Sequence, residues 1–351
     1  MENAGMLGIV VNPHSGRDAR RLFARAGTST IEDKRNQVTR IVVGAAAAGI
    51  EKILLSRDSF RIASAATEAL SLEVDCELLD IELTGHGIDS QKAALAMKEA
   101  GCGALVALGG DGTSRAITQV WRDVVLLPLS TGTNNVFPFH VEATIAGAAA
   151  GLVASGRLAV EDAARRAKIL EVVCESGAES LALIDAALLV DDHPGSLLQA
   201  DPEKLARILL TRAEPASVGL SPVGGLVMPC HAEDDFAVEV QSRPKAHPER
   251  SGKSLRTPIS PGLYANVGIE AVERVELGAE VRWTGPGLLA FDGDREIVLA
   301  DGENAVLRVL RKGPWVLDPG RAMVAAAEQG LFIDLGHWHD QRSGANAGGC
   351  C

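Results

Sequence analysis

Short hydrophobic runs alternate with amphipathic stretches along the first part of the chain. The runs at residues 7–11, 52–56, 74–79, 104–108 and 125–129 have the length and apolar character of buried strands. Between and after them, apolar positions recur with helical spacing at residues 33–48, 58–70, 89–100, 113–121 and 142–154. Strands that alternate with helices predict parallel pairing in a doubly wound α/β sheet.

The pattern changes after residue 154, and strand-like segments dominate from about residue 168. Residues 169–174, 181–190, 236–240 and 305–310 are typical of strands, and residues 201–212 predict a helix between them. The polar segment 241–256 predicts an exposed loop, and residues 319–330 predict a last helix that returns to the first domain. We therefore predict a Rossmann-like α/β domain at 1–165, a β-rich domain at 166–318, and the returning helix with a flexible tail at 319–351.

Composition and charge narrow the classes of function. The 351 residues suffice for two domains, and 46% hydrophobic with 23% charged residues is typical of a globular protein. A net charge of −12 argues against nucleic-acid binding, although backbone N–H groups can hold a nucleotide without a basic surface. No hydrophobic run approaches the ~18 residues of a membrane helix, and the six cysteines fit no metal spacing. These features predict a cytoplasmic protein without stable membrane association.

The strongest chemical signal is a glycine-rich turn directly after the run at 104–108. It comprises Gly109, Gly110, Asp111, Gly112 and Thr113, and a helical pattern follows. Glycines let backbone N–H groups approach a phosphate, and the N-terminus of a helix attracts negative charge. Asp111 is unfavourable beside phosphate unless it binds Mg²⁺, orients a hydroxyl or accepts a proton. A tight turn with an Asp cap is the structural alternative, but this string after a buried strand favours a phosphate site.

Three more polar turns occupy comparable positions. One follows the first strand, a second precedes the helix at 89–100, and the third follows the strand at 125–129. For each of them a capping turn is the structural alternative. Parallel strands bring their carboxyl ends to one edge of a sheet, which favours a shared ligand site. The candidate residues are Asn12, Ser15 and Gly16, then Thr84, and then Thr131, Gly132, Thr133, Asn134 and Asn135.

Another candidate lies in the second domain, at Asp292, Gly293 and Asp294. An Asp-Gly pair between apolar runs predicts a β-hairpin turn. The functional interpretation is that Asp292 or Asp294 faces the glycine loop, where two carboxylates could divide metal binding and base chemistry.

These motifs resemble those of a known superfamily. Residues 109–113 match the signature shared by NAD kinases, diacylglycerol kinases, sphingosine kinases and 6-phosphofructokinases. Residues 12–16 and 127–135 are similar to the Asn-Pro-x-Ser-Gly and Pro-x-Gly-Thr-x-Asn stretches of its lipid-kinase branch. With residues 211–215 and 291–296 added, the chain most resembles the ATP-NAD kinase-like acetoin-catabolism protein X family, up to about residue 338.

The resemblance implies a homo-oligomeric kinase that uses ATP and Mg²⁺, with its active site between the two domains. By position it implies that Asp111 is the catalytic or Mg²⁺-associated carboxylate, with Asp294 as the second candidate base. The predicted phosphate-binding residues are Asn12, Ser15, Gly16, Thr84, Gly109, Gly110, Gly112 and Thr113. The predicted substrate-binding residues are Thr131, Gly132, Thr133, Asn134, Asn135, Asp185 and Asp292.

Two stretches depart from the NAD kinase pattern. NAD kinases carry an Asn-Glu pair on an early strand of the second domain, whereas this chain has Ile184 and Asp185, of which only Asp185 resembles the acid. Residues 257–264 keep only the ends of the Thr-Pro-Thr-Gly-Ser-Thr-Ala-Tyr stretch. NAD is the phosphate acceptor that the resemblance names. The alternatives are a different small-molecule or lipid hydroxyl, or a nucleotide-binding accessory protein without turnover.

Overall fold

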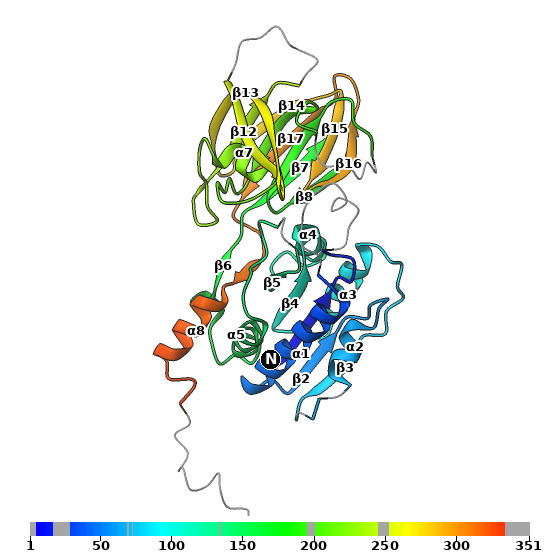
Figure 1. Ribbon diagram of the computed structural model, residues 1–351, viewed down its shortest axis with the longest axis vertical. Helices are drawn as coiled ribbons and strands as arrows, with labels where there is room; N and C mark the ends of the chain where they lie inside the picture. The colour runs from blue at the N-terminus through cyan, green and yellow to red at the C-terminus, as the bar shows by residue number, and fades with distance from the viewer. Residues whose placement is uncertain are drawn as a thin grey trace, which may run out of the picture.

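The computed structural model describes residues 5–16, 29–68, 70–71, 73–132, 135–194, 201–244 and 253–333. Two halves are stacked along the long axis of the molecule, a parallel α/β half and a β-rich half (Figure 1). The first half carries most of the helices, and the second is built almost entirely of strands (Figure 1).

One sheet forms the centre of the N-terminal half. Its spatial order in the described residues is β3-β2-β1-β4-β5-β18-β6, and all neighbours are parallel except β18 and β6. The strands are β1 (Met6–Val11), β2 (Lys52–Leu55), β3 (Asp75–Leu78), β4 (Ala104–Gly109), β5 (Val125–Ser130), β6 (Ala164–Arg166) and β18 (Trp315–Leu317). Strand β6 precedes the β-rich half in the chain, and strand β18 follows it. Both strands belong to this sheet, so the β-rich half is connected to it at both of its ends.

Helices cover both faces of this sheet, as a doubly wound fold requires. One hydrophobic core joins the sheet to α1 (Ile31–Ala47), α2 (Ile62–Thr67), α5 (Ala143–Ala154) and α8 (Pro319–Glu328). The core of the other face joins it to α3 (Ile88–Glu99) and α4 (Asp111–Val120). The short α6 (Val160–Ala163) precedes β6 and contacts α8. The parallel doubly wound sheet predicted from the sequence is thereby confirmed, and α8 returns to it.

The β-rich half contains two antiparallel sheets. One has the order β12-β13-β11-β10-β9-β15-β16, and the other has the order β14-β17-β7-β8. The first consists of β9 (Asp185–Leu189), β10 (Leu205–Leu210), β11 (Phe236–Ser242), β12 (Lys253–Ser260), β13 (Leu263–Glu276), β15 (Gly287–Phe291) and β16 (Asp294–Leu299). The second consists of β7 (Ile169–Cys174), β8 (Glu179–Ala182), β14 (Glu280–Thr284) and β17 (Asn304–Leu310).

These two sheets pack face to face around a core that includes Trp283 and Phe291, both fully buried. The Trp283 indole Nε1–H donates to Glu239 Oε1 at 2.8 Å, which satisfies its polar atom inside the core. On its other face, the larger sheet packs against α7 (Ser221–Gly225). Part of that face is left uncovered by α7 and lines the pocket described below.

Strand order explains why ligand-binding turns gather at one place. The chain runs outward from β1 to β2 and β3, then returns to form β4 on the opposite side of β1. Turns that leave the carboxyl ends of β1 and β4 therefore diverge and leave a crevice, where open α/β sheets bind ligands. Residues 12–16 leave β1 and residues 110–113 leave β4, so both motifs lie at this crevice.

The helix predicted at residues 201–212 is wrong, because these residues contain strand β10. Leu205, Ile208 and Leu209 have a spacing that fits a helical face. In the structure, β10 lies between β9 and β11 and pairs with both. Pairing on both sides satisfies its backbone groups, and the tertiary arrangement outweighs the local pattern.

Two other strand assignments differ from the prediction. The strand predicted at 181–190 is divided into β8 and β9, because the N–H groups of Leu183 and Ile184 bond to the Asp292 carboxylate instead of a neighbouring strand. The segment predicted as an exposed loop at 241–256 begins inside β11 and ends inside β12. The predicted tail lies outside the described residues.

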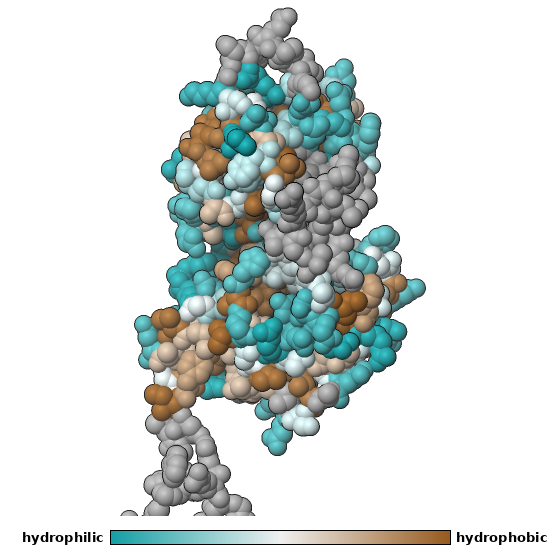
Figure 2. Space-filling model, in the orientation of Figure 1, coloured by the Kyte–Doolittle hydropathy of each residue, from teal (hydrophilic) through white to brown (hydrophobic). Residues whose placement is uncertain are grey.

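In the described part of the chain, no helix is both long and apolar enough to cross a membrane. Hydrophobic side chains appear in separate patches among hydrophilic ones on the face shown in Figure 2. Such scattered apolar surface is normal for a globular protein.

Candidate functional site

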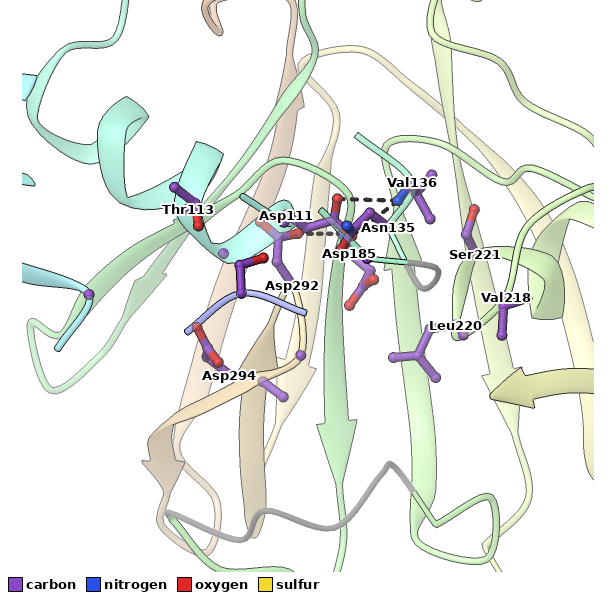
Figure 3. Close-up of a pocket in the computed structure, with 18 of the residues that line it drawn as sticks. Asp111, Thr113, Asn135, Val136, Asp185, Val218, Leu220, Ser221, Asp292 and Asp294 are labelled. Carbon is purple, nitrogen blue, oxygen red and sulfur yellow. Dashed lines mark hydrogen bonds between the residues drawn. The ribbon is translucent and has the colours of Figure 1, made fainter. Parts of the chain in front are cut away.

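A cavity of about 380 Å³ lies where the two halves meet, and residues of both halves line it. Figure 3 shows the carboxylates of Asp111, Asp185 and Asp292 gathered near its centre, with Thr113 on one side and Leu220 on the other. The cavity brings together most of the predicted site residues. Those that line it are Asn12, Ser15, Gly16, Gly110, Asp111, Gly112, Thr113, Gly132, Asn135, Asp185, Asp292 and Asp294.

The glycine turn starts α4 two residues earlier than the sequence pattern indicates. Gly110 is the N-cap, and its carbonyl accepts from the N–H groups of Thr113 and Ser114 at 3.1 and 3.2 Å. A Cβ on Gly110 would lie 2.7 Å from Asn135 Oδ1, so the turn has no room for a side chain. The positive end of α4 therefore faces the cavity with its first N–H groups available for an anion.

Asp111, the first residue of α4, is fixed by backbone donors. Its Oδ1 accepts from Phe137 N at 2.9 Å, and both carboxylate oxygens lie 3.2 Å from Val136 N (Figure 3). Desolvation raises the pKa of Asp111 to about 7, opposed by these N–H groups and reinforced by the charge of Asp292. A carboxylate with a pKa near neutrality, held in a fixed orientation, is suited to general-base catalysis.

The turn after β1 is held to the glycine turn by its own side chains. Asn12 Nδ2 donates to Thr113 Oγ1 at 2.8 Å, and Asn12 Oδ1 accepts from the N–H groups of His14 and Ser15. Thr131 Oγ1 donates to Ser15 Oγ at 2.8 Å, which links the turn after β5 to the same cluster. Three turns from neighbouring parallel strands thus form one continuous wall of the cavity.

Lys34 supports this wall, and the sequence interpretation missed it. The side chain is fully buried, and its Nζ donates to the carbonyls of Asn12, Pro13 and Ser15 at 2.9, 2.8 and 2.6 Å. Its position could have indicated burial, because Lys34 lies four residues before Val38 on the apolar face of α1. Burying an ammonium group requires such hydrogen bonds, so Lys34 fixes the shape of the turn.

Asp292 holds the opposite wall. It begins a two-residue hairpin between β15 and β16, with φ of 48° at Asp292 and 88° at Gly293. Its carboxylate accepts from the N–H groups of Leu183, Ile184 and Asp185 at 2.8, 2.8 and 3.1 Å. The predicted hairpin is correct, and the carboxylate closes the gap between β8 and β9.

Asp185 has a different environment, although it lies beside Asp292. It is 8% exposed, and its Oδ1 is buried without a hydrogen-bond partner among the described residues. Desolvation and the nearby charges of Asp292 and Asp111 raise the pKa of Asp185 well above its ordinary value. An unsatisfied buried carboxyl group is costly, and a ligand that bonds to it removes that cost.

Asp294 and Arg115 join the two halves. Asp294 lies opposite Gly112, whose hypothetical Cβ would be 3.5 Å from Asp294 Oδ2. Arg115 on α4 is buried, and it donates to both carboxylate oxygens of Glu296 on β16, at 2.5 and 2.7 Å. It also donates to Leu181 O and Ser180 Oγ on β8. Sequence reasoning missed Arg115 because its partners are far away along the chain.

Arg212, in the motif at residues 211–215, supports the segment that holds Asp111. Its guanidinium lies over the Phe137 ring at 5.0 Å from the centroid, and its Nη1 donates to Val136 O at 3.5 Å. Its charge also lowers the pKa of Asp111, which partly offsets desolvation. Arg212 therefore helps to position Asp111 by holding Val136 and Phe137, whose N–H groups bond to the Asp111 carboxylate.

Several predicted residues do not line the cavity. Thr84 is exposed and forms a turn in which its hydroxyl and N–H both donate to Asp89 Oδ1 at 2.8 Å. Gly109 lies beneath the turn, and its hypothetical Cβ would be 2.4 Å from Thr113 Oγ1. Thr131 acts through Ser15, as described above. Thr133 and Asn134 lie outside the described residues.

In the residues that the structure describes, no group of three or more His, Cys, Asp or Glu side chains is arranged to hold a metal ion by itself.

Two family profiles match successive parts of the chain. Residues 7–157 match the ATP-NAD kinase N-terminal domain, and residues 168–312 match the acetoin catabolism protein X C-terminal domain. The acetoin catabolism protein X of Cupriavidus necator (strain H16) is 32% identical over 316 residues, which cover 87% of each protein. The chain belongs to the acetoin catabolism protein X family. The matched regions contain the glycine turn and the Asp292 hairpin, so both walls of the cavity lie within the matched regions of this chain.

The fold also occurs in a solved kinase structure. The structure of yeast NADH kinase complexed with NADH aligns with a TM-score of 0.54 at 14% identity, over 95% of this chain and 89% of that one. At this identity the similarity concerns the fold alone. The acetoin catabolism protein X family therefore has the architecture of NAD kinases, as the sequence motifs predicted.

Proposed function

We propose that this protein is an ATP-dependent phosphotransferase that transfers the γ-phosphoryl group to a hydroxyl group in the cavity between the two halves. The observation that carries the proposal is Asp111, a fixed carboxylate with a pKa of about 7 at the N-terminus of α4. The glycine turn and the Asn12 turn offer backbone N–H groups for the phosphates, at the switch point of the sheet.

The chemical step follows from these positions. The acceptor oxygen attacks the γ-phosphorus, the bond to the β–γ bridging oxygen breaks, and ADP leaves with that electron pair. Asp111 accepts the proton of the hydroxyl, and its backbone donors keep the carboxylate oriented toward the cavity. Asp294 is the second candidate base, since it lies opposite Gly112 on the facing wall.

Mg²⁺ is the expected partner of the nucleotide. When bound, it neutralises the phosphate charge and orients the transferred group. With Asp111 as the base, the residue that would hold it is Asp294, whose carboxylate lies opposite Gly112 in the turn that would receive the phosphates. One or two carboxylates suffice for such an ion, so the residues present fit it.

NAD is the first acceptor to test, because the first half matches the ATP-NAD kinase N-terminal domain. Purified protein is incubated with ATP, Mg²⁺ and NAD, and NADP is measured with a coupled dehydrogenase while ADP release is measured in parallel. Removal of a general base typically lowers turnover by about 10²–10⁴-fold, which is the loss expected for Asp111→Asn. Asp301→Asn, an exposed aspartate on a turn, is the matched control and keeps wild-type turnover.

The two readouts separate the outcomes. NADP formation identifies NAD as the acceptor, and ADP release with another hydroxyl compound retains the phosphotransferase and replaces the acceptor. If Asp111→Asn turns over as fast as wild type, the role given to Asp111 is wrong. Nucleotide binding without turnover on any hydroxyl compound would favour an accessory protein. The departures from the NAD kinase pattern at residues 184–185 and 257–264 also favour that alternative.

A further inference from the structure

We call the wall formed by the turns after β1, β4 and β5 the phosphate-binding wall, after the function proposed for it. The cavity wall contributed by the β-rich half differs from it chemically. We call it the acceptor face and define it by Asp185, Ala187, Leu189, Val218, Leu220 and Ala290. Asp185, Ala187 and Leu189 alternate along β9 and therefore share one side of the sheet. Ala290 on β15 pairs directly with Ala187, so two methyl groups form a shallow floor beside Asp185.

This floor suits a short aliphatic group. Alanine side chains leave space above the sheet, and Val218 and Leu220 line the same cavity (Figure 3). The polar group of the face is the Asp185 carboxyl, which is 8% exposed and has an unpartnered Oδ1. A hydroxyl group can both donate and accept a hydrogen bond, so it satisfies this carboxyl in either protonation state.

The charges of the cavity indicate an uncharged ligand. Asp111, Asp185 and Asp292 lie close enough together to raise the pKa of Asp185. Among the described residues that line the cavity there is no lysine, and the arginine present, Arg295, is paired with Asp192 at 2.6 Å. The other nearby cation, Arg115, is already bonded to both carboxylate oxygens of Glu296 and lies 3.8 Å from Asp294. An anionic acceptor would therefore meet these carboxylates with the neighbouring arginines already paired, which is unfavourable.

We propose that the acceptor face binds an uncharged, short-chain vicinal diol, with one hydroxyl on Asp185, its alkyl carbon on Ala187 and Ala290, and the adjacent hydroxyl directed toward Asp111. The proposal rests on the phosphotransferase function for the fate of that second hydroxyl, which becomes the phosphate ester while ATP becomes ADP. Binding of the diol itself does not require turnover. A dinucleotide, with its two phosphates, does not match this face.

The first experiment measures binding by titration with nuclear magnetic resonance, using the full-length protein. Propane-1,2-diol and propane-1,3-diol have the same atoms and differ only in the spacing of their hydroxyls. We expect the 1,2-isomer to bind at least ~10-fold more tightly, because one hydrogen bond to a carboxylate is worth about that factor. Glycerol should bind, and glycerol 3-phosphate should not. Equal binding of the two isomers, or preference for glycerol 3-phosphate or NAD, overturns the proposal.

Two variants test the named contacts. Asp185→Asn keeps the shape of the side chain and should weaken propane-1,2-diol binding by roughly 10-fold or more. Ala187→Leu fills the floor and should abolish it, while the Kd for ATP changes by less than ~2-fold in both variants. Asp301→Asn is the control and leaves diol binding unchanged. Unchanged diol binding in both folded variants, with circular dichroism and Tm as checks, contradicts the proposal.

Turnover with ATP and Mg²⁺ then separates this inference from the proposed function. Formation of a diol phosphate with an equal amount of ADP supports both. Diol binding that depends on Asp185, without any phosphorylated product, retains the ligand class and rejects the phosphotransferase. ADP release with other acceptors, without diol binding, retains the phosphotransferase and rejects the diol.

Discussion

The two walls of the cavity are built in different ways. The wall that we propose for the phosphates consists of turns at the ends of β1, β4 and β5, and each turn is continuous in sequence and rich in glycine or hydroxyl groups. The acceptor face combines residues of β9, β15 and the segment before α7, three segments separated by tens of residues. Backbone groups form the first wall, and side chains form the second. A family can therefore keep the first wall and change its ligand by exchanging a few side chains on the second.

The largest expected effect concerns the contact that holds the walls together. Arg115→Met leaves Glu296 without its ion-pair partner and removes the hydrogen bond to Leu181 O, and should lower the free energy of unfolding by about 3 kcal/mol. Arg122→Met is the matched control, because Arg122 also pairs with a glutamate of the β-rich half, Glu171, but is exposed. That exposed pair is worth about 0–1 kcal/mol. Urea unfolding measures both, and equal losses would contradict a special role for Arg115.

A second comparison tests whether the phosphate-binding wall depends on its backbone. Gly16 and Gly85 have positive φ values of 74° and 79°, but a Cβ on Gly16 would lie 2.4 Å from Thr131 O and one on Gly85 would meet nothing within 4 Å. Both Gly→Ala changes carry the left-handed strain of about 1–2 kcal/mol. Gly16→Ala should in addition raise the Kd for ATP by roughly 10-fold, since the turn must move. Gly85→Ala should leave it unchanged. Calorimetric titration with ATP decides the comparison.

The pH dependence should distinguish Asp111 from the backbone groups around it. The pKa of Asp111 is about 7, so kcat/KM should fall about tenfold for each pH unit below that value as the base becomes protonated. Stability should change in the opposite direction. Because the folded pKa lies above the ordinary 3.8, the native state keeps a proton that the unfolded chain loses, and stability declines as pH rises from about 4 to about 7.

Asp111→Asn should remove the contribution of Asp111 from both curves. Activity that is constant from pH 5 to 8 in the wild type would contradict the assignment of Asp111 as the base. Initial rates and thermal unfolding midpoints over the same buffers provide the two measurements.

The smallest effect is expected at Thr84, which was predicted to contact phosphate and lies outside the cavity. Thr84→Val removes the hydrogen bond from the hydroxyl to Asp89, keeps the bond from the backbone N–H, and should cost about 1 kcal/mol of stability. The KM for ATP should change by less than ~2-fold. A large increase in the KM for ATP would support the original prediction that Thr84 contacts phosphate.

Most of the phosphate-binding wall could be predicted from the sequence. Its signals are local, since a buried run followed by glycines and a helical pattern specifies a strand, a turn and a helix N-terminus within about ten residues. The hairpin at Asp292 was equally local, because Asp-Gly fits a turn with two positive φ values. The parallel sheet followed from the alternation of such units. Lys34 was missed, although a lysine at the head of an apolar helix face was visible.

The sequence by itself determined the fold class, the family and the turns that line the cavity, because each depends on short-range patterns. Only the tertiary structure decided that residues 205–210 form a strand and that Arg115 joins the halves. The same holds for Asp185, whose Oδ1 has no hydrogen-bond partner among the residues that the structure describes. The physical reason is the separation in sequence between the residues that interact. Strand pairing and burial of a charge depend on partners that the fold brings together from distant positions, and no local pattern records which partners those are.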